Sequence, residues 1–208
     1  YEIGRGVLEV LGLNMDLQDG DLAARANFCS LRDGVVIDRR AGRIETKETE
    51  RLCALISQAI PEIEGVKLII RPGKSHRFAI IFRGGHLSDK LTDADPHKDN
   101  RPVAYSSPKS AEAEFSSILT NTFIKKVQEL LKDEKVANGV LLRGFSVKPD
   151  IPTFTTRYKM NALAIATYPM YRGIAKVLGM DVKEEPKDYD EMVKILKNNY
   201  DDYQFFFM

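Results

Sequence analysis

The residues with the clearest chemistry lie between positions 37 and 44, where three arginines and a carboxylate are separated by small residues. The stretch reads Asp38-Arg39-Arg40-Ala41-Gly42-Arg43. Arginine presents a planar fork of donors that matches a phosphate or carboxylate, and it keeps its charge. The alanine and glycine keep the backbone thin, which lets a ligand approach closely. The three arginines could therefore converge on one anion. The alternative is a solvated basic turn whose arginines pair with neighbouring acidic residues, namely Asp33, Asp38 or Glu45.

A second basic loop lies between two β-branched or aromatic runs, residues 66–70 and 78–82. The loop carries Arg71, Lys74, His76 and Arg77. Binding residues are commonly held on loops by a rigid scaffold, and a histidine that titrates near neutral pH could donate to a phosphate. The alternative for His76 is an ordinary surface residue. Ser75 precedes it, but adjacent residues seldom form a nucleophile and base pair, so a nucleophile is not favoured.

The segment Asp93-Ala94-Asp95-Pro96-His97 spaces two carboxylates and an imidazole at intervals of two residues, as a metal site could. Pro96 restricts Asp95 to an extended conformation, and a loop of this composition is equally typical of an ordinary turn. We therefore do not expect a metal there. The chain also lacks the glycine-rich patterns of P-loop and dinucleotide-binding proteins.

Length and composition limit the possible classes of protein. With 208 residues, 43% hydrophobic content and a net charge of +1, the chain can bury a sizeable core as one large or two small domains. A charge so near neutral argues against nucleic-acid binding driven by bulk charge. No run approaches the roughly 20 apolar residues of a membrane span. Cys29 and Cys53 lack the spacing of a zinc site or disulfide framework, which fits a reducing compartment. We expect a cytoplasmic protein without nucleic-acid or membrane partners.

Periodicity predicts that the first part of the chain mixes helices and strands. Residues 4–12 form a short helix or hinge that stops at Gly12. A strand over 22–30 turns Arg25 and Asn27 outward from its apolar residues, and a tight turn at 32–34 leads into a hairpin. Residues 66–70 and 78–82 form a second strand pair. Thr46 is predicted to cap a helix that buries a stripe of Leu52, Leu55, Ile56 and Ala59 and is ended by Pro61.

The middle of the chain combines a long loop with the clearest helix. Residues 84–108 are rich in Gly, Pro, Asp and Ser, and loops of this length are usually functional or disordered. A short apolar strand is expected over 139–142. Helical spacing over 110–134 predicts a buried stripe of Phe115, Ile118, Leu119, Thr122, Val127, Leu130 and Leu131.

Beyond a linker at 149–152, the pattern changes to strand (162–166), helix (168–178), helix (189–197) and strand (204–208). This order predicts a crossover of a parallel sheet. We divide the chain into three segments, a hinge and helix (1–21), residues 22–152 and residues 153–208. The chain starts without Met and ends in an apolar strand of the kind buried on both faces, so we expect a piece of a longer protein.

Several short motifs occur in an order that resembles one family. They are Gly4-Arg5-Gly6, the 38–43 stretch, His76-Arg77, Leu87-Ser88-Asp89-Lys90, the 93–97 segment, Leu142-Arg143-Gly144 and the segment 168–182. Together they make the chain similar, over nearly its whole length, to the archaeal-type cofactor-independent (2,3-bisphosphoglycerate-independent) phosphoglycerate mutases of the alkaline phosphatase superfamily.

The resemblance implies an enzyme that interconverts 3-phosphoglycerate and 2-phosphoglycerate through a phosphoserine, with two divalent metals (Mn, Mg or Co). It places the catalytic serine and most metal ligands before and after this chain, so we expect no catalytic residue, metal ligand or cofactor within it. The implied fold is α/β, with an inserted substrate-binding domain (22–152) followed by a fragment of the metal-binding, alkaline-phosphatase-like parallel-sheet domain (153–208). The implied substrate is a small phosphorylated acid. The residues expected to bind it are Asp38, Arg39, Arg40, Arg43, His76, Arg77, Asp95, His97 and Arg143.

Two departures from the family pattern keep other functions open. Asn161 stands where the family usually has a lysine, Lys159 is the nearest cation, and the Gly-Ala-Thr-Gly segment usual after Val182 is absent. Loss of a phosphate-neutralising charge would remove transition-state stabilisation. One alternative is a phosphohydrolase or phosphotransferase of the same superfamily that acts on another phosphorylated or phosphonate acid. The other is a non-catalytic module that binds an anion or RNA, although few aromatics are interleaved with the basic residues.

Overall fold

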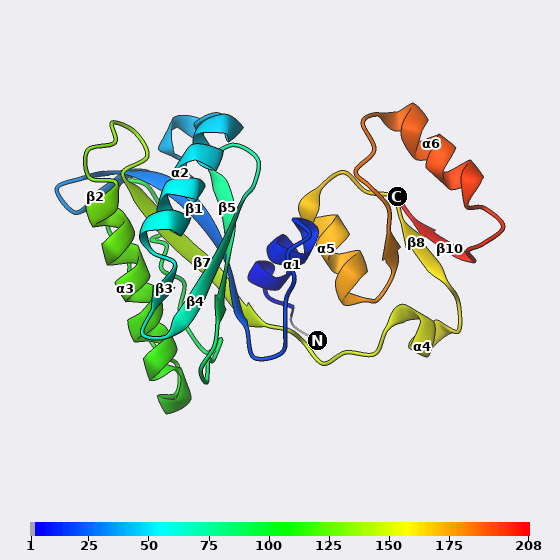
Figure 1. Cartoon of the computed structure of the whole chain (residues 1–208), viewed down its shortest axis with the longest axis horizontal. Coiled ribbons are helices and arrows are strands. Elements are labelled where there is room, and N and C mark those ends of the chain that lie inside the picture. The colour runs from blue at the N-terminus through cyan, green and yellow to red at the C-terminus, as the bar shows by residue number, and fades with distance from the viewer. Residues whose placement is uncertain (1–2) are drawn as a thin grey trace.

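The computed structural model describes residues 3–208, so the first two residues of the expected hinge segment, Tyr1 and Glu2, lie outside the described residues. The chain forms two α/β parts with helix α1 (Arg5–Gly12) between them (Figure 1). The expected α/β class, with a large mixed part followed by a small parallel sheet, is confirmed. The predicted helix at 4–12 is confirmed as α1.

The N-terminal part is built on a seven-stranded sheet in the order β3-β4-β5-β1-β2-β6, with β7 also paired to β1. The central strand β1 runs antiparallel to β2, β5 and β7. The two predicted strand pairs are confirmed as the hairpins β1–β2 and β4–β5. The strands are β1 (Leu22–Arg32), β2 (Val35–Asp38), β3 (Glu62–Ile63), β4 (Val66–Pro72), β5 (Arg77–Arg83), β6 (Arg101–Pro102) and β7 (Gly139–Val147).

Strand β7 is longer than the predicted 139–142 segment. Its pairing with β1 shifts register between Ala23 and Arg25, and there Gly144 adopts a φ of +63°. A glycine accommodates this conformation without a Cβ penalty, so the ladder continues past the irregularity. Arg143 is therefore held within a strand.

Helices α2 (Thr46–Ala59) and α3 (Glu114–Leu130) cover one face of this sheet (Figure 1). The core between them contains four fully buried phenylalanines. Thr46, predicted to cap α2, is instead its first residue, and Glu45 occupies the N-cap position. Ala59, predicted in the buried stripe of α2, is exposed, whereas Cys53 is buried. The phenylalanines are Phe28, Phe78, Phe82 and Phe123.

The buried face of α3 differs from the predicted stripe. Phe115 and Ile118 are 38% and 61% exposed, whereas Phe123 is fully buried. The first half of α3 faces the long 84–108 loop, and this contact is polar: the hydroxyls of Ser106 and Thr120 are hydrogen bonded at 2.8 Å. A polar interface of this kind leaves no signal in apolar periodicity, which explains the wrong prediction.

The C-terminal part contains a three-stranded parallel sheet in the order β10-β8-β9. The predicted strand, helix, helix and strand are confirmed as β8, α5, α6 and β10. Because β10 is an edge strand here, Phe205 is 36% exposed, and the prediction of a strand buried on both faces is wrong for this chain. The elements are α4 (Phe154–Tyr158), β8 (Ala162–Ala164), α5 (Pro169–Val177), β9 (Asp181–Val182), α6 (Tyr189–Asn198) and β10 (Phe205–Phe207).

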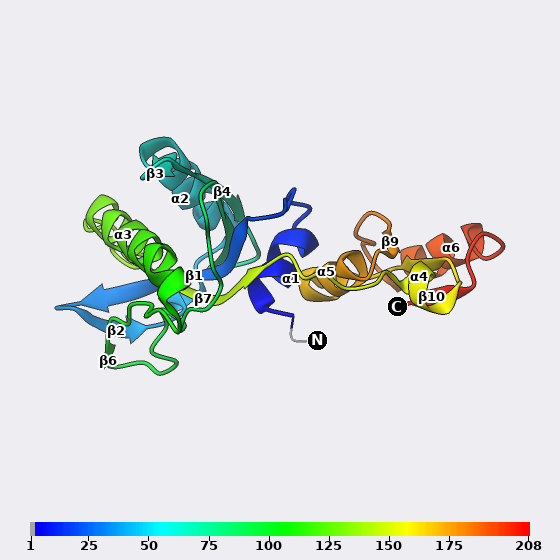
Figure 2. The ribbon, with the colours of Figure 1, turned by 90° about the horizontal axis from the view of Figure 1, so that it is seen from below.

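Helix α1 joins the two parts (Figures 1 and 2). A Cβ on Gly12 would overlap the carbonyl of Pro169, and a Cβ on Gly173 would overlap the carbonyl of Leu8. Glycine at both positions therefore permits backbone contact between α1 and α5. On its other side, α1 packs on β1, where Gly6 faces the carbonyl of Ala23.

The two cysteines are buried free thiols. Burial raises the pKa of Cys53 to about 12 and that of Cys29 further. Such thiols are inert as nucleophiles. Across residues 3–208, no helix combines the length and apolar character needed to cross a membrane.

Candidate functional site

A polar band crosses the sheet face that α2 and α3 leave uncovered. Arg25 of β1 lies opposite Arg143 of β7, and Asn27 of β1 lies opposite Arg77 of β5. Residues paired across a ladder share a face, so these four side chains form one group. Apolar clusters flank the band, with Val7, Val10, Ala23, Ala79 and Ile81 on the α1 side and Cys29, Val36 and Leu141 on the other.

Arg25 and Asn27 do lie on the face opposite the apolar residues of β1, but the expectation that they point to solvent is wrong. They are only 5% and 4% exposed. Helix α1 packs over this face and brings the Glu9 carboxylate 3.7 Å from Arg25 Nε. The alternation in the sequence distinguishes the two faces of a strand, but only the packing of α1 decides that both are covered.

Arg39 and Asp95 form an ion pair that adjoins the band at Arg143. Arg39 Nε and Nη2 donate to the two oxygens of Asp95 at 2.8 and 2.7 Å, and the Asp95 side chain is fully buried. The hydrogen bond to Asp95 raises the pKa of Arg39. Burial alone would raise the pKa of Asp95, but hydrogen bonds from Arg39 and from the backbone N–H of His97 lower it below its usual value. Arg39 thus has a buried structural partner.

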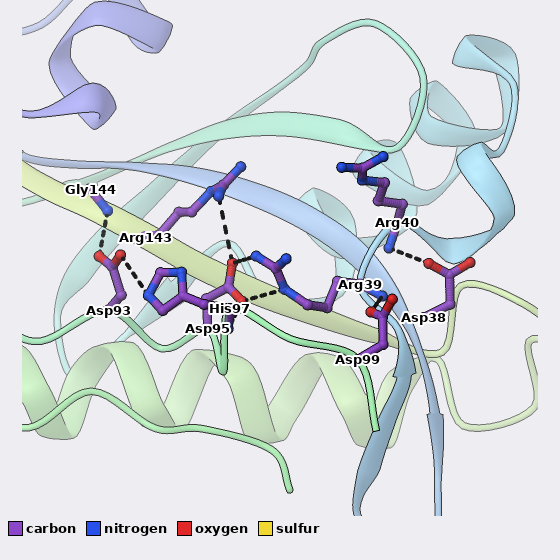
Figure 3. Close-up of polar contacts among 9 residues, drawn as sticks. All are labelled: Asp38, Arg39, Arg40, Asp93, Asp95, His97, Asp99, Arg143 and Gly144. Atoms are coloured by element: carbon purple, nitrogen blue, oxygen red, sulfur yellow. Dashed lines mark hydrogen bonds and ion pairs between the residues drawn. The ribbon is translucent and has the colours of Figure 1, made fainter. Parts of the chain in front are cut away.

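Arg143 contacts the same carboxylate more loosely. Its Nη1 lies 3.8 Å from Asp95 Oδ2. Burial, followed by the nearby charge of Arg25, lowers the pKa of Arg143. The single Asp95 charge is thus shared between two guanidinium groups, Arg39 at hydrogen-bond distance and Arg143 beyond it. Figure 3 shows both guanidinium groups directed toward Asp95, and that of Arg40 directed away from it.

The 38–43 turn is held by its own carboxylate. Asp38 accepts hydrogen bonds from the backbone N–H groups of Arg40 (2.8 Å) and Gly42 (2.6 Å). Ala41, Gly42 and Arg43 all have positive φ values of 44°, 61° and 55°. Such conformations are strained for residues other than glycine and persist where the surroundings enforce them. Asp38 therefore shapes the turn rather than pairing with an arginine side chain.

The buried His76 lies amid cationic groups. Burial, and then the charges of Arg77, Arg40, Arg25 and Arg43, lower the pKa of His76 from 6.5 to about 4. The imidazole is therefore neutral at physiological pH, with Ser75 Oγ 3.3 Å from its Nδ1. We call Arg40, Arg43, His76 and Arg77 the turn cluster.

The arginines of the turn cluster carry uncompensated charge. In the part of the chain that the structure describes, no carboxylate forms an ion pair with Arg40, Arg43 or Arg77. Three guanidinium groups around a neutral imidazole suit a multiply charged oxyanion, since each arginine can donate two parallel hydrogen bonds. Arg40 and Arg43 are exposed and can be reached from solvent.

A cavity of about 540 Å³ lies on the other side of Arg143. His97 lines it, with Nε2 3.4 Å from Asp93 Oδ2, and Asp93 also accepts a hydrogen bond from the backbone of Gly144 at 2.8 Å. Figure 3 shows this chain of contacts. Further charged residues in the lining are Arg5, Asp89, Lys90 and Lys109.

Two cations of the second basic loop do not join these groups. Arg71 Nη1 donates to the carbonyls of Leu13 and Asn14, and Lys74 forms an ion pair with Glu185 at 2.8 Å. Both side chains therefore face α1 or the C-terminal part. Of the loop's cationic and imidazole groups, only His76 and Arg77 belong to the turn cluster.

Apart from Asp38, which holds the turn through backbone hydrogen bonds, the expected residues thus fall into three groups along the sheet: the turn cluster, the Arg39–Asp95–Arg143 centre and the His97 cavity. Residues 3–208 hold no cluster of three or more His, Cys, Asp or Glu placed to hold a metal ion.

Sequence reasoning did not single out Arg25, Arg5, Lys90 or Lys109 as site residues. A signal existed for Arg25, because a charged residue inside an apolar strand is unusual unless it is paired or functional. Arg5 and Lys90 lie in motifs that carry the family resemblance, but no role was assigned to them, and Lys109 lies in none of these motifs. All three positions are exposed, and only the fold brings them to one cavity.

Comparison with known proteins identifies the family. The family model of 2,3-bisphosphoglycerate-independent phosphoglycerate mutase matches residues 1–137. A protein of Thermotoga maritima named probable 2,3-bisphosphoglycerate-independent phosphoglycerate mutase is 45% identical over 208 residues, which cover all of this chain and 52% of that protein. One of Thermus thermophilus with the same name is 42% identical over 211 residues, again covering all of this chain and 52% of the relative. The chain therefore spans about half the length of these relatives.

Solved structures agree with the sequence relatives. The cofactor-independent phosphoglycerate mutase of Thermoplasma acidophilum superposes with a TM-score of 0.72 at 31% identity, covering all of this chain and 59% of that one. A Pyrococcus horikoshii protein shares the fold with a TM-score of 0.73 at 22% identity, covering 99% of this chain and 50% of that one. The chain accordingly belongs to the 2,3-bisphosphoglycerate-independent phosphoglycerate mutase family.

Proposed function

We propose that this chain supplies the substrate-binding residues of a metal-dependent phosphoglycerate mutase, which interconverts 3-phosphoglycerate and 2-phosphoglycerate through a phosphoserine. The phosphoserine and the divalent metals (Mn, Mg or Co) belong to the parts of the protein outside this chain. The chain's own residues bind and orient a small phosphorylated acid. A cytoplasmic location fits this role.

The observation that carries the proposal is the uncompensated charge of the turn cluster. Arg40, Arg43 and Arg77 lie around the neutral His76 without a carboxylate partner in residues 3–208. Arg39, in contrast, is already neutralised by Asp95. The phosphate is therefore assigned to the turn cluster, and Arg39, Asp95, Arg143 and His97 position the rest of the ligand.

The first test is turnover. The full-length protein, supplied with Mn²⁺, should convert 3-phosphoglycerate to 2-phosphoglycerate. A rate no higher than the background without protein would contradict the proposal. Arg40→Ala should lower kcat/KM at least about tenfold, because a charge-assisted hydrogen bond contributes about 1.5–3 kcal/mol. Arg101→Ala is the matched control, since Arg101 is an exposed arginine on β6 outside the turn cluster, and it should leave kcat/KM unchanged.

A second function is favoured by Asn161. Asn161 stands where the family usually has a lysine. Its backbone carbonyl, before β8, accepts hydrogen bonds from the backbone N–H groups of Gln204 (3.1 Å) and Phe205 (3.2 Å), and this contact does not depend on the side chain. A protein without the lysine could act as a phosphohydrolase or phosphotransferase on another phosphorylated or phosphonate acid. Phosphate release from a panel of such acids, together with the mutase assay, separates the two functions.

A further inference from the structure

The polar band contains buried groups without hydrogen-bond partners. Residues 3–208 include four buried side-chain nitrogen or oxygen atoms that lack a partner, and three belong to this band: Arg25 Nε, Asn27 Oδ1 and Arg143 Nε. Native proteins satisfy nearly all such groups, and the exceptions call for a ligand, a water or a functional role. Their concentration on one face is the starting observation.

Arg25 and Asn27 are the more constrained pair. Both are more than nine-tenths buried, and both lie on the central strand β1. The one ion-pair partner of Arg25 among the described residues is Glu9, and the 3.7 Å separation is too long for a hydrogen bond. Burying Arg25 Nε and Asn27 Oδ1 without hydrogen bonds costs free energy in the isolated chain. A ligand that supplies these hydrogen bonds would therefore bind favourably.

The missing partners define the chemistry of that occupant. Arg25 Nε and Arg143 Nε are donors and require acceptor oxygens, whereas Asn27 Oδ1 is an acceptor and requires a donor. A phosphate or carboxylate supplies acceptors, but the fully ionised groups supply no donor. A hydroxyl supplies one. The complementary ligand therefore carries both acid oxygens and a hydroxyl group.

The location fits the same ligand. Asn27 is paired across the sheet with Arg77 of the turn cluster, and Arg25 is paired with Arg143, which lines the 540 Å³ cavity. A ligand whose phosphate binds the turn cluster and whose acid end reaches toward Arg143 would place its middle carbon atoms over Arg25 and Asn27.

We propose that Asn27 accepts a hydrogen bond from the hydroxyl group of a phosphorylated hydroxy acid, and that Arg25 donates to an oxygen of the same ligand. This inference rests on the proposed function. It adds two binding residues and assigns them the selection of hydroxylated over non-hydroxylated acids. Neither residue takes part in the chemical step.

The test compares two ligands on the full-length protein after dialysis against a chelator, so that turnover does not accompany binding. One ligand is 3-phosphoglycerate, and the other is 3-phosphonooxypropanoate, which has the same phosphate and carboxylate but a hydrogen in place of the hydroxyl. Calorimetric titration should show that the wild type binds the hydroxylated acid about tenfold more tightly, as expected for one hydrogen bond and one satisfied buried group. Asn27→Ala should bring this ratio to near one and leave the affinity for the propanoate unchanged.

Two further variants separate recognition from folding. Asn138→Ala is the matched control, because Asn138 also lies beside β1 but its amide is already bonded to Leu31, at 2.6 and 3.0 Å. It should retain the tenfold preference. Asn27→Asp keeps an oxygen acceptor at the same place and should also retain the preference for the hydroxylated acid. Its negative charge should lower the affinity for both acids equally.

Each outcome decides the inference. A wild type that binds both acids equally, or an Asn27→Ala variant that keeps the preference, overturns it and leaves the proposed function standing. Loss of the preference in Asn27→Asp also overturns it, because the acceptor would still be present. If the wild type binds neither acid, the proposed function fails and this inference fails with it.

Discussion

At the scale of single residues, the site is organised by how each arginine is compensated. Arg39 is fully engaged by a buried carboxylate, Arg143 shares that carboxylate at a longer distance, and Arg40, Arg43 and Arg77 have no carboxylate partner in the described part of the chain. Compensated arginines hold the structure, whereas uncompensated ones are available to a ligand. This division decides which variants test binding and which test stability.

Replacement of Asp95 should destabilise the fold. Asp95→Asn removes one charge of a buried pair, so the Arg39 guanidinium is left without a counter-charge. Removing one partner of a buried pair costs about 3–5 kcal/mol, and about 2 kcal/mol is expected here because Arg39 retains some access to water. Chemical denaturation measures the free energy of unfolding. Asp99→Asn is the control, because Asp99 is exposed and accepts a hydrogen bond from the backbone N–H of Arg39. This replacement should lower the free energy of unfolding by less than about 1 kcal/mol. Equal stability of the two variants would contradict this assignment.

His76 should make the free energy of unfolding depend on pH between about 4 and 6.5. Its pKa is about 4 in the folded chain and 6.5 when unperturbed. As the pH falls from about 6.5 toward 4, the unfolded chain binds a proton that the folded chain does not, so the free energy of unfolding falls by at most about 3 kcal/mol. Asp95, whose pKa lies below 3.8, loses its contribution only at lower pH.

The measurement is denaturant unfolding at several pH values between 4.5 and 7. His76→Gln should flatten the dependence, because glutamine does not titrate. His86→Gln, at an exposed histidine, should preserve it. If His76→Gln leaves the slope unchanged, the histidine is not buried neutral as described.

At the scale of elements, the central feature is the backbone contact between α1 and α5. Gly173→Ala tests this contact, because helix propensity and steric overlap should change the stability in opposite directions. Helix propensity alone predicts that alanine inside α5 stabilises by about 1 kcal/mol. The added Cβ, however, would overlap the Leu8 carbonyl, and forced overpacking costs about 1–3 kcal/mol. We expect net destabilisation in thermal unfolding, and an increased Tm would show that α1 and α5 are not packed in this way.

At the scale of the whole molecule, the division between binding and chemistry yields a prediction for the 208-residue chain alone. The family resemblance places the phosphoserine and most metal ligands elsewhere, so this chain with Mn²⁺ should not convert 3-phosphoglycerate. Hydrogen bonding of its arginines to an oxyanion does not require a metal. The chain should therefore still bind phosphoglycerate or sulfate weakly, with a Kd of about 1 mM. NMR titration should detect this binding and its loss in Arg40→Ala. Turnover by the chain alone would contradict the division.

The sequence by itself determined the type and order of the main elements, but it did not predict the short elements β3, β6, α4 and β9. Alternating residues predicted the strands of both hairpins, helical spacing predicted α2, α3, α5 and α6, and the later strand, helix, helix, strand order predicted the parallel sheet. The motifs around Arg39, His76 and Arg143 indicated the family before any comparison. These predictions succeeded because element type follows from local periodicity and turn chemistry. The boundaries of the three segments and the roles of the site residues stay predictions.

Only the tertiary structure decided which charges are paired and which faces are covered. Arg39 meets Asp95 across 56 positions of sequence, and neither its own neighbours nor their spacing identifies that partner. The burial of Arg25 depends on α1, and the burial of Ser117 and Thr120 in place of Phe115 depends on hydrogen bonds to Ser106 of the polar loop. The physical reason is common to all three: desolvation and ion pairing depend on groups brought together by long-range contacts, which local patterns do not encode.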